Sequence, residues 1–201
     1  MKKLFLAVLV LLICACNKPA KTLSKLSNDA VILAFGDSLT FGTGASTNND
    51  YPSILAELAH RDVINEGVPG EVSADGSKRL PALLDEYQPQ LLVLIHGGND
   101  LLKKIPEQET VANLDSMIVE AKNRNIPVIM MGVPKPGLIF MESADMYQAI
   151  AKRNDILIDL DTLPTILGDN DLKSDLIHPN NAGYRQMATN IINLLKDAGA
   201  L

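Results

Sequence analysis

Two segments of the chain carry side chains that could act together as a nucleophile and its general base. Ser38 stands in Gly36-Asp37-Ser38-Leu39, and Asp175 precedes His178 by three residues. This spacing lets the carboxylate accept a hydrogen bond from the imidazole Nδ1–H, which leaves Nε2 free to take a proton from a serine. Pro179 stiffens the loop directly behind the histidine. These residue types predict acyl transfer through an activated serine.

Two glycine-containing segments could supply the hydrogen-bond donors that an oxyanion needs. In Asn65-Glu66-Gly67-Val68-Pro69-Gly70, either glycine can offer an N–H with no Cβ in the way. In Gly97-Gly98-Asn99-Asp100, the Asn99 carboxamide is a candidate N–H donor. Each segment also has a purely structural interpretation. Ser38 could cap a helix, Pro69-Gly70 could form a turn, and Asn99 or Asp100 could cap the next helix.

The remaining histidines and the cysteines point to no further chemistry. We expect His60 to end a helix and His96 to be packed and hydrogen-bonded at the end of an apolar run. No two histidines have metal-ligand spacing, and the sequence contains neither a Walker loop nor a dinucleotide fingerprint. Cys14 and Cys16 both lie near the N-terminus, which excludes a disulfide or a cysteine-based metal site in the folded domain. No cofactor and no metal are expected.

The elements that must position these residues alternate between short apolar runs and stretches with helical spacing. Apolar runs without a polar face predict buried strands at Ala30–Phe35, Val63–Asn65, Leu91–His96, Val128–Gly132 and Ile156–Asp159. Helices are predicted at Pro52–His60, Ser77–Glu86, Met141–Asn154, around Val111–Ala121 and over Tyr184–Leu195. This alternation predicts one domain of the α/β class, a three-layer α/β/α sandwich around a five-stranded parallel sheet.

That architecture brings the candidate residues together. Ligands of open parallel sheets bind beyond the carboxyl ends of the strands, near the point where the strand order reverses. Ser38, Gly70 and Asn99 follow the first three predicted strands, and His178 precedes the last helix. The sequence therefore predicts a nucleophile, oxyanion donors and a base at one edge of the sheet.

The N-terminus has the features of an export signal. Met1-Lys2-Lys3 is followed by the apolar run Leu4–Ile13, which as a helix would rise only about 15 Å, half of a bilayer core. We interpret residues 1–15 as a signal peptide. Ile13-Cys14-Ala15-Cys16 resembles the lipobox of bacterial lipoproteins, and Cys16 is the better lipid acceptor because it follows the small Ala15. An ordinary cleaved signal that releases the protein is the alternative.

The predicted organisation is therefore a signal peptide, a lipid-anchored polar tether over residues 16–28, and a domain over residues 29–201. The protein would lie on the extracytoplasmic side of a bacterial membrane, periplasmic or at the cell surface. Its formal net charge of −6, without a basic stripe along the chain, argues against nucleic acid as a partner.

The complete set of motifs resembles the GDSL/SGNH hydrolase family. The family's blocks match, in order, Gly36–Leu39, Gly70, Gly97–Asp100 and Asp175–His178, and the resemblance runs from about Ala30 to Leu195. It implies a flavodoxin-like sandwich with Ser38 as nucleophile, His178 as base and Asp175 as the carboxylate that orients it. It also implies an oxyanion hole made of the Ser38 and Gly70 N–H groups and the Asn99 side chain. Gly70 is preferred to Gly67 because Pro-Gly-Glu matches the family's small, glycine, acidic pattern.

Within that family, Phe35–Thr40 and Gly132-Val133-Pro134 are similar to the bacterial arylesterase, acyl-CoA thioesterase and lysophospholipase subgroup. The resemblance implies small acyl esters or thioesters, including lysophospholipids, as substrates. The loop Pro134–Met141 ends in four apolar residues, which could hold an acyl chain or pack at the start of the next helix. A carbohydrate O-deacetylase of the same fold and a non-catalytic ligand-binding lipoprotein are the alternatives. The lack of tryptophan weakens the first, and the intact set from Ser38 to His178 weakens the second.

Overall fold

The computed structural model describes residues 21–135 and 142–201 and has a five-stranded, all-parallel sheet at its centre. The strand order is β2-β1-β3-β4-β5, so the order reverses between β1 and β3. The register aligns the carboxyl end of β1 with that of β3, pairing Gly36 with Ile95. The strands are β1 (Val31–Gly36), β2 (Asp62–Gly67), β3 (Leu91–Ile95), β4 (Val128–Met131) and β5 (Leu157–Asp159).

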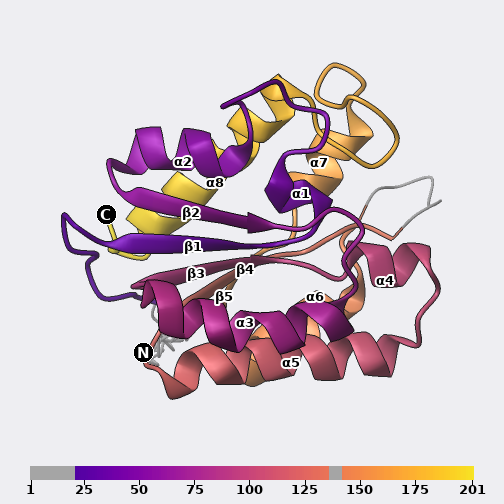
Figure 1. Cartoon of the computed structure of the whole chain (residues 1–201). Helices are drawn as coiled ribbons and strands as arrows, with labels where there is room; N and C mark the ends of the chain where they lie inside the picture. Colours follow the sequence, from indigo (N-terminus) through magenta and orange to yellow (C-terminus); the bar gives the residue numbers. More distant parts are fainter. Residues whose placement is uncertain (1–20, 136–141) are drawn as a thin grey trace, which may run out of the picture.

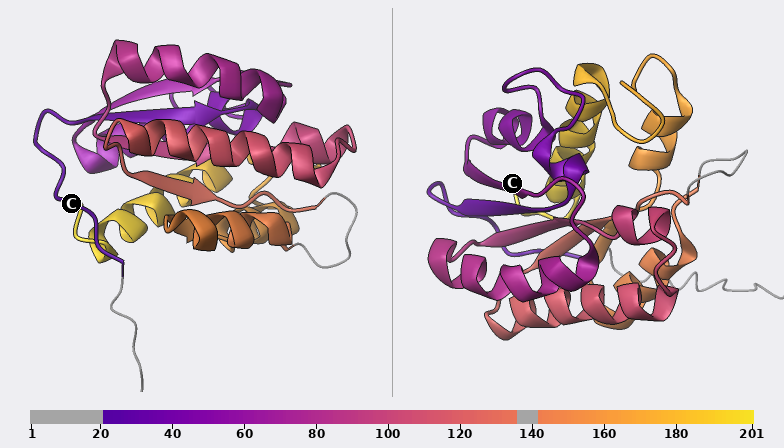
Figure 2. Two further views of the ribbon diagram at one scale, coloured as in Figure 1. Left: turned by 90° about the horizontal axis from the view of Figure 1, so that it is seen from below. Right: turned by 45° about the vertical axis from the view of Figure 1, so that its right-hand side comes forward.

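Helices cover both faces of the sheet, which completes the three layers (Figure 1). α2 and α8 pack together on one face, while α3, α5 and α6 lie side by side on the other (Figure 2). The helices are α1 (Ser38–Phe41), α2 (Tyr51–Ala59), α3 (Ser73–Tyr87), α4 (Gly98–Leu102), α5 (Glu107–Asn123), α6 (Asp145–Asn154), α7 (Thr162–Gly168) and α8 (Asn181–Asp197). The predicted α/β/α sandwich with a five-stranded parallel sheet is confirmed.

The burial of the strands follows from their position in the sheet. All residues of β3 and β4 are buried, and β1 is buried except at its first residue, because helices cover both of their faces. The edge strands β2 and β5 are only partly buried. The apolar runs that predicted the strands are therefore the residues that form the core of the domain.

The helices differ from the predicted ranges at several places. α6 begins at Asp145 rather than Met141, and α5 begins at Glu107, four residues before Val111. α3 begins at Ser73 rather than near Ser77, because the Ser73 N–H donates to the Asp100 carboxylate, a partner distant in the sequence. α7 was not predicted. Its first N–H group, on Thr162, donates to the Asp159 side chain at 2.9 Å, so a short and largely buried segment still forms a helix.

The packed domain also begins before the predicted boundary at Asp29. The Leu23 and Leu26 N–H groups donate to the carbonyls of Ala198 and Ala200, and Leu26 is buried in the core. The last residues of the predicted tether are thus held against the C-terminus. The predicted signal peptide and Cys16 lie outside the described residues. No helix in the described part of the chain is long and apolar enough to cross a membrane.

Candidate active site

Ser38 is presented at the carboxyl end of β1 by a turn that needs a glycine. A Cβ on Gly36 would lie 2.0 Å from the Ile95 carbonyl oxygen, so only glycine allows β1 to run this close to β3 here. Asp37, not Ser38, caps α1, since its side chain accepts a hydrogen bond from the Leu39 N–H at 3.1 Å. The N-cap interpretation of Ser38 is therefore wrong. Ser38 is the first helical residue, whose N–H has no acceptor within its helix.

The C-terminal Asp-His pair lies directly against this serine. The His178 Nε2 is 3.0 Å from the Ser38 Oγ, and the His178 Nδ1 is 2.8 Å from an Asp175 carboxylate oxygen. The other Asp175 oxygen accepts the backbone N–H groups of Ile177 and His178, each at 2.8 Å. Burial alone would raise the pKa of Asp175, but these hydrogen bonds, that from His178 foremost, lower the pKa below its usual value. The serine, the imidazole and an ionised carboxylate form one continuous chain.

The loop that carries the pair is closed by its own backbone. The Ser174 N–H donates to the His178 carbonyl at 2.9 Å, and Lys173 forms an isolated bridge with Pro179. The Asn180 side chain then caps α8, accepting the N–H groups of Ala182 and Gly183. His178 is thus held between a closed loop and the start of a long helix, which fixes the direction of its ring.

Asn99 approaches the same place from the carboxyl end of β3. Gly97, at φ +97°, caps α4 and turns the chain so that Asn99 lies in its first turn. One N–H of the Asn99 carboxamide donates to the Glu71 carbonyl oxygen at 3.0 Å. The second N–H of the same nitrogen remains for a ligand. Neither Asn99 nor Asp100 caps α4, so the capping interpretation of this segment is wrong.

The two candidate oxyanion glycines have different structural roles. A Cβ on Gly67 would lie 2.0 Å from the Phe41 nitrogen, so packing of α1 against β2 explains this glycine. Gly70 has φ +80° and no atom within 4 Å of its Cβ position, so it is required only by its backbone conformation. It lies in a turn closed by the Glu71 N–H and the Val68 carbonyl. The turn predicted from Pro69-Gly70 is present, and Gly70 as an oxyanion donor stays a prediction.

Two acidic residues near Asn99, Glu71 and Asp100, had no catalytic role in the predicted site. Asp100 accepts the Ser73 N–H at 2.8 Å and the Ser73 hydroxyl at 2.5 Å. Glu71 accepts from Arg79 and lies 3.2 Å from the His96 Nε2. His96 is fully buried, as its predicted packed role requires. Ser73 and Asp100 are 27 residues apart and Glu71 and His96 are 25 apart, so no local spacing could have indicated these two pairs.

A cavity of about 400 Å³ opens in front of Ser38, His178 and Asn99. Its remaining walls are mostly apolar, although Lys135 contributes a positive charge and Asp37 a buried carboxylate. Two of its lining residues, Leu176 and Leu102, are 80% and 44% exposed, so the rim is apolar as well. The apolar lining is made of Leu39, Leu102, Val133, Pro134, Leu167, Leu176 and Ile177. Most of the apolar loop Pro134–Met141 lies outside the described residues.

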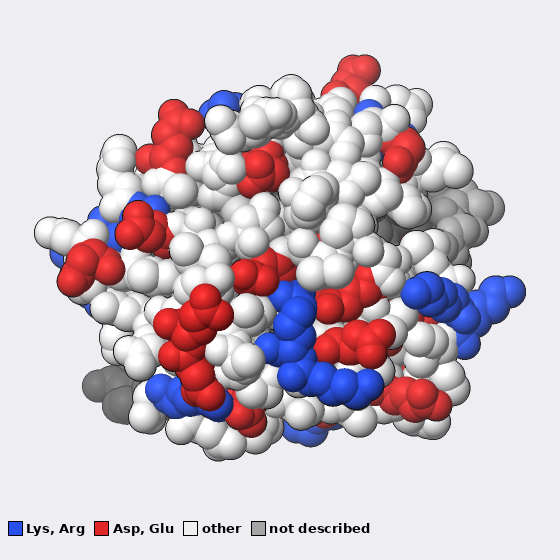
Figure 3. Space-filling model, in the orientation of Figure 1, with Lys and Arg blue, Asp and Glu red and all other residues white. Residues whose placement is uncertain are grey.

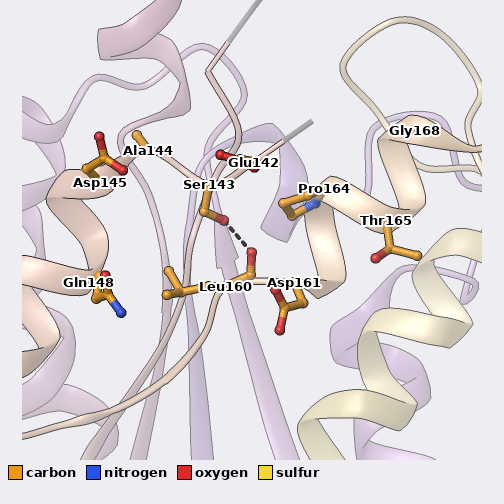
Figure 4. Close-up of a pocket in the computed structure, with 10 residues that line it drawn as sticks. All are labelled: Glu142, Ser143, Ala144, Asp145, Gln148, Leu160, Asp161, Pro164, Thr165 and Gly168. Carbon is orange, nitrogen blue, oxygen red and sulfur yellow. Dashed lines mark hydrogen bonds between the residues drawn. The ribbon is translucent and has the colours of Figure 1, made fainter. Parts of the chain in front are cut away.

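A larger hollow, of about 630 Å³, contains none of the candidate residues (Figure 4). Its lining is more polar than that of the cavity at Ser38 and includes the acidic residues Glu142, Asp145 and Asp161. The Ser143 hydroxyl donates to the Leu160 carbonyl at 2.7 Å. The described residues contain no group of three or more His, Cys, Asp or Glu side chains that could hold a metal ion. Acidic and basic side chains are interspersed over the face drawn in Figure 3.

Comparison with known proteins places the chain in a family. Residues 34–186 match the model of the GDSL-like Lipase/Acylhydrolase family. The chain is 30% identical over 156 residues to the thioesterase 1/protease 1/lysophospholipase L1 of Escherichia coli K12, which covers 74% of this chain and 75% of that protein. It is 30% identical over 175 residues to esterase TesA of Pseudomonas aeruginosa, with 82% and 87% coverage.

Solved structures and a more distant relative extend the comparison. The crystal structure of TesA matches with a TM-score of 0.75 and 28% identity over 84% of this chain and 99% of that one. AlinE4, an SGNH-hydrolase family esterase, matches with a TM-score of 0.64 and 30% identity over 87% and 98%. The uncharacterized lipoprotein YqeF of Bacillus subtilis is 29% identical over 118 residues, covering 51% of this chain and 48% of that protein.

Proposed function

Because this chain belongs to the GDSL-like lipase/acylhydrolase family and is an ester-hydrolysing enzyme, we propose that it works as a serine esterase through a Ser38–His178–Asp175 triad. The observation that carries the proposal is the 3.0 Å contact between the His178 Nε2 and the Ser38 Oγ, in front of an open cavity. A base at hydrogen-bond distance from a hydroxyl can remove its proton as the hydroxyl attacks.

The tautomer of His178 follows from its carboxylate partner. An ionised Asp175 can only accept, so the His178 Nδ1 carries the proton of their 2.8 Å hydrogen bond. The Nε2 then has a free lone pair directed at Ser38. When the Ser38 proton arrives there, Asp175 stabilises the resulting imidazolium. Because hydrogen bonds lower the pKa of Asp175, this carboxylate stays ionised at neutral pH.

The negative oxygen of the tetrahedral intermediate needs donors on the other side of the carbonyl carbon. We assign the Ser38 N–H, the Gly70 N–H and the second N–H of the Asn99 side chain to this role. In the described chain no hydrogen bond occupies the Gly70 N–H, and Asn99 lines the same cavity as Ser38. The N-terminus of α1 adds a partial positive charge next to the Ser38 N–H.

The reaction then proceeds in two acyl transfers. The Ser38 Oγ attacks the acyl carbonyl while His178 takes its proton, and collapse of the intermediate breaks the bond to the leaving group, which receives that proton from His178. An acyl group remains on Ser38. A water molecule gives a proton to His178 and attacks the acyl carbon, and the released serine oxygen takes the proton back as the acid departs.

The cavity favours an acyl chain over a sugar as the group that it holds. Its walls are mainly leucine, isoleucine, valine and proline side chains, and the described residues that line it include no Phe, Tyr or Trp ring on which a sugar could stack. We therefore propose acyl esters or thioesters, lysophospholipids among them, as substrates, in preference to acetylated carbohydrates.

We further propose that the protein is exported and anchored through a lipid on Cys16. Support comes from the apolar run before Cys16 and from the similarity to a Bacillus subtilis lipoprotein. Cells fed an alkyne-bearing fatty acid should label the wild type and Cys14→Ala but not Cys16→Ala. Labelling of Cys16→Ala would contradict the anchor without affecting the proposed chemistry.

A panel of substrates tests the proposed function. Purified enzyme should hydrolyse nitrophenyl esters of short and medium acyl chains much faster than it releases acetate from acetylated sugars. Ser38→Ala should lose at least about 10³-fold in kcat on every active substrate. Preference for acetylated sugars would favour the deacetylase alternative. Full activity of Ser38→Ala would overturn the triad.

A further inference from the structure

Glu71 links the candidate oxyanion glycine to the candidate oxyanion asparagine. It directly follows Gly70, and its carbonyl oxygen accepts one N–H of the Asn99 side chain at 3.0 Å. This hydrogen bond fixes the plane of the carboxamide and therefore the direction of its second N–H. The position of the Asn99 donor thus depends on where the Glu71 backbone is held.

The Glu71 side chain is fixed by hydrogen bonds with Arg79 and His96. It is a carboxylate with only 7% of its side chain exposed. Arg79 reaches both of its oxygens, with Nε at 2.9 Å from one and Nη2 at 2.8 Å from the other. Burial alone would raise the pKa of Glu71, but hydrogen bonds from His96 and Arg79 and the Arg79 charge lower that pKa to about 2. The carboxylate is therefore ionised whenever the protein is folded at neutral pH.

Both ring nitrogens of His96 have a partner in the protein, and one of them faces this carboxylate. The Gly97 N–H donates to Nδ1 at 2.8 Å, so Nε2 must carry the proton and donate to Glu71 at 3.2 Å. Space for the ring comes from Gly76, inside α3, where a Cβ would lie 2.4 Å from Nε2. A glycine inside a helix costs about 1 kcal/mol relative to alanine, and here it makes room for this contact.

Arg79 connects the cluster to two strands. Its guanidinium carbon lies 4.3 Å from the centre of the Phe35 ring in β1, and its Nη2 donates to the Glu66 carbonyl in β2 at 3.1 Å. The Arg79 Nη1 also donates to the Glu66 carboxylate at 3.0 Å. Glu71 is therefore fixed relative to the strand that presents Ser38, not only to its own loop.

From these contacts we propose that Glu71, held by Arg79 and His96, is a positioning residue that aims the Asn99 side chain at the reacting carbonyl. The inference rests on the proposed function, because it assumes that Asn99 stabilises an oxyanion. A second connection supports it, since Asp100, the neighbour of Asn99, binds the N–H and hydroxyl of Ser73 two residues beyond Glu71. The 70–73 loop and α4 are therefore joined by hydrogen bonds that each of them donates to the other.

Glu71→Gln tests the proposal, because it preserves the backbone carbonyl and the side-chain length but removes the charge that Arg79 binds. We expect kcat on a nitrophenyl ester to fall about 10- to 100-fold, with KM within about threefold of wild type. Glu120→Gln is the matched control. It removes a carboxylate from Arg124 near the end of α5 that leads to β4, and kcat should not change.

A double-mutant cycle separates positioning from a general structural effect. Asn99→Ala should reduce kcat about 10²- to 10³-fold in the wild type but only about tenfold in the Glu71→Gln background. Two independent losses that multiply would contradict the proposal, because a residue that acts through Asn99 cannot matter fully once Asn99 is gone. Wild-type kcat of a folded Glu71→Gln would overturn it as well.

Arg79→Lys provides a second route if Glu71→Gln does not fold. It keeps a positive charge but cannot donate to both carboxylate oxygens in parallel, and kcat should fall about tenfold with the same failure to multiply with Asn99→Ala. An Arg79→Lys loss that multiplies fully with Asn99→Ala would overturn the proposal. Failure of the proposed function itself is distinguishable, because Ser38→Ala would then remain active.

Discussion

The molecule contains two histidine–carboxylate pairs whose surroundings differ completely. His178 lies at the surface loop beside an Asp175 side chain that is 53% exposed, and only its Nδ1 is bound by the carboxylate. His96 is fully buried beside Glu71, and the protein occupies both of its ring nitrogens. The His178 Nε2 instead meets the Ser38 hydroxyl in front of a cavity.

The difference shows what a histidine needs in order to act as a base. A carboxylate partner alone is insufficient, since both rings have one. What distinguishes His178 is a ring nitrogen with a free lone pair, directed at a nucleophile, with open space beyond it. His96 donates its only ring N–H to a carboxylate and accepts a hydrogen bond from the Gly97 N–H, so it can hold a structure in place but has no lone pair left for a reaction.

The strongest test of the different roles of His178 and His96 is to replace each of them, in separate variants, by glutamine. His178→Gln should reduce kcat on the order of 10⁵-fold, because no base remains for Ser38. His96→Gln should reduce kcat only about tenfold, through loss of the hold on Glu71. Initial rates on a nitrophenyl ester measure both. Equal losses in the two variants would contradict the different roles that the geometry assigns.

Removing the charge of the exposed carboxylate should have the next largest effect. Asp175→Asn can donate to the His178 Nδ1, which would place the imidazole proton on Nε2, facing Ser38. We expect kcat to fall about 10²- to 10³-fold with KM nearly unchanged, a smaller loss than for His178→Gln. A kcat within twofold of wild type would show that Asp175 does not set the tautomer of the base.

Replacing His96 should reduce the stability of the fold more than replacing His178 does, the reverse of their effects on kcat. His96→Ala leaves a cavity and a buried carboxylate that has lost a donor, so the free energy of unfolding should fall by about 3 kcal/mol. His178→Ala, in a surface loop, should change it by less than about 0.5 kcal/mol. Urea unfolding at neutral pH provides both values. A strongly destabilised His178→Ala would mean that the loop is part of the folding core.

The Glu71–His96 pair should make the stability of the protein depend on pH in the acid range, because the pKa of Glu71 is lowered in the folded state. The pKa of Glu71 is lowered from 4.5 to about 2 in the folded protein. Its contribution to stability is therefore fully present above pH 4.5 and is lost as the pH falls toward 2. Between pH 6 and pH 3, the wild type should lose on the order of 2 kcal/mol more unfolding free energy than Glu71→Gln. Parallel pH profiles for the two proteins would contradict the lowered pKa.

The smallest predicted effect concerns the cavity that lies in front of His178 and has no counterpart at His96. Leu102→Ser and Leu176→Ser make the rim of the cavity polar, while both side chains are far enough exposed to leave the fold intact. We expect kcat/KM for an octanoate ester to fall about 3- to 10-fold relative to an acetate ester. Unchanged chain-length preference in both variants would place the acyl chain elsewhere.

Local patterns in the sequence predicted the features that depend on neighbouring residues. Continuous apolar runs predicted all five strands. For β1, β3 and β4 the reason is that a strand covered on both faces has no room for an alternating polar side, whereas β2 and β5 are only partly buried. The Asp175–His178 contact spans only three residues, so its spacing alone indicated the pair. Part of the need for Gly36 is local as well, since a Cβ there would lie 2.3 Å from the Oγ1 of Thr40, four residues on.

Features that depend on distant contacts could not be predicted in this way. The Glu71–His96 pair joins residues 25 apart, and the cap that starts α3 at Ser73 comes from Asp100, 27 residues away. The same reason explains why Leu26 was assigned to a tether although it packs against the C-terminus. Each of these contacts forms only after folding, when the sheet brings segments that are distant in the sequence to the same edge of the sheet or the same end of the domain.

The most direct test of the account is phosphonylation by a fluorophosphonate, followed by intact mass and peptide mapping. We predict one adduct on the Ser38 Oγ of the wild type, none on Ser38→Ala, much slower labelling of His178→Gln, and labelling of His96→Gln that is at most about tenfold slower. An unmodified wild type, or an adduct that persists on Ser38→Ala, would contradict the assignment of Ser38 as the nucleophile activated by His178.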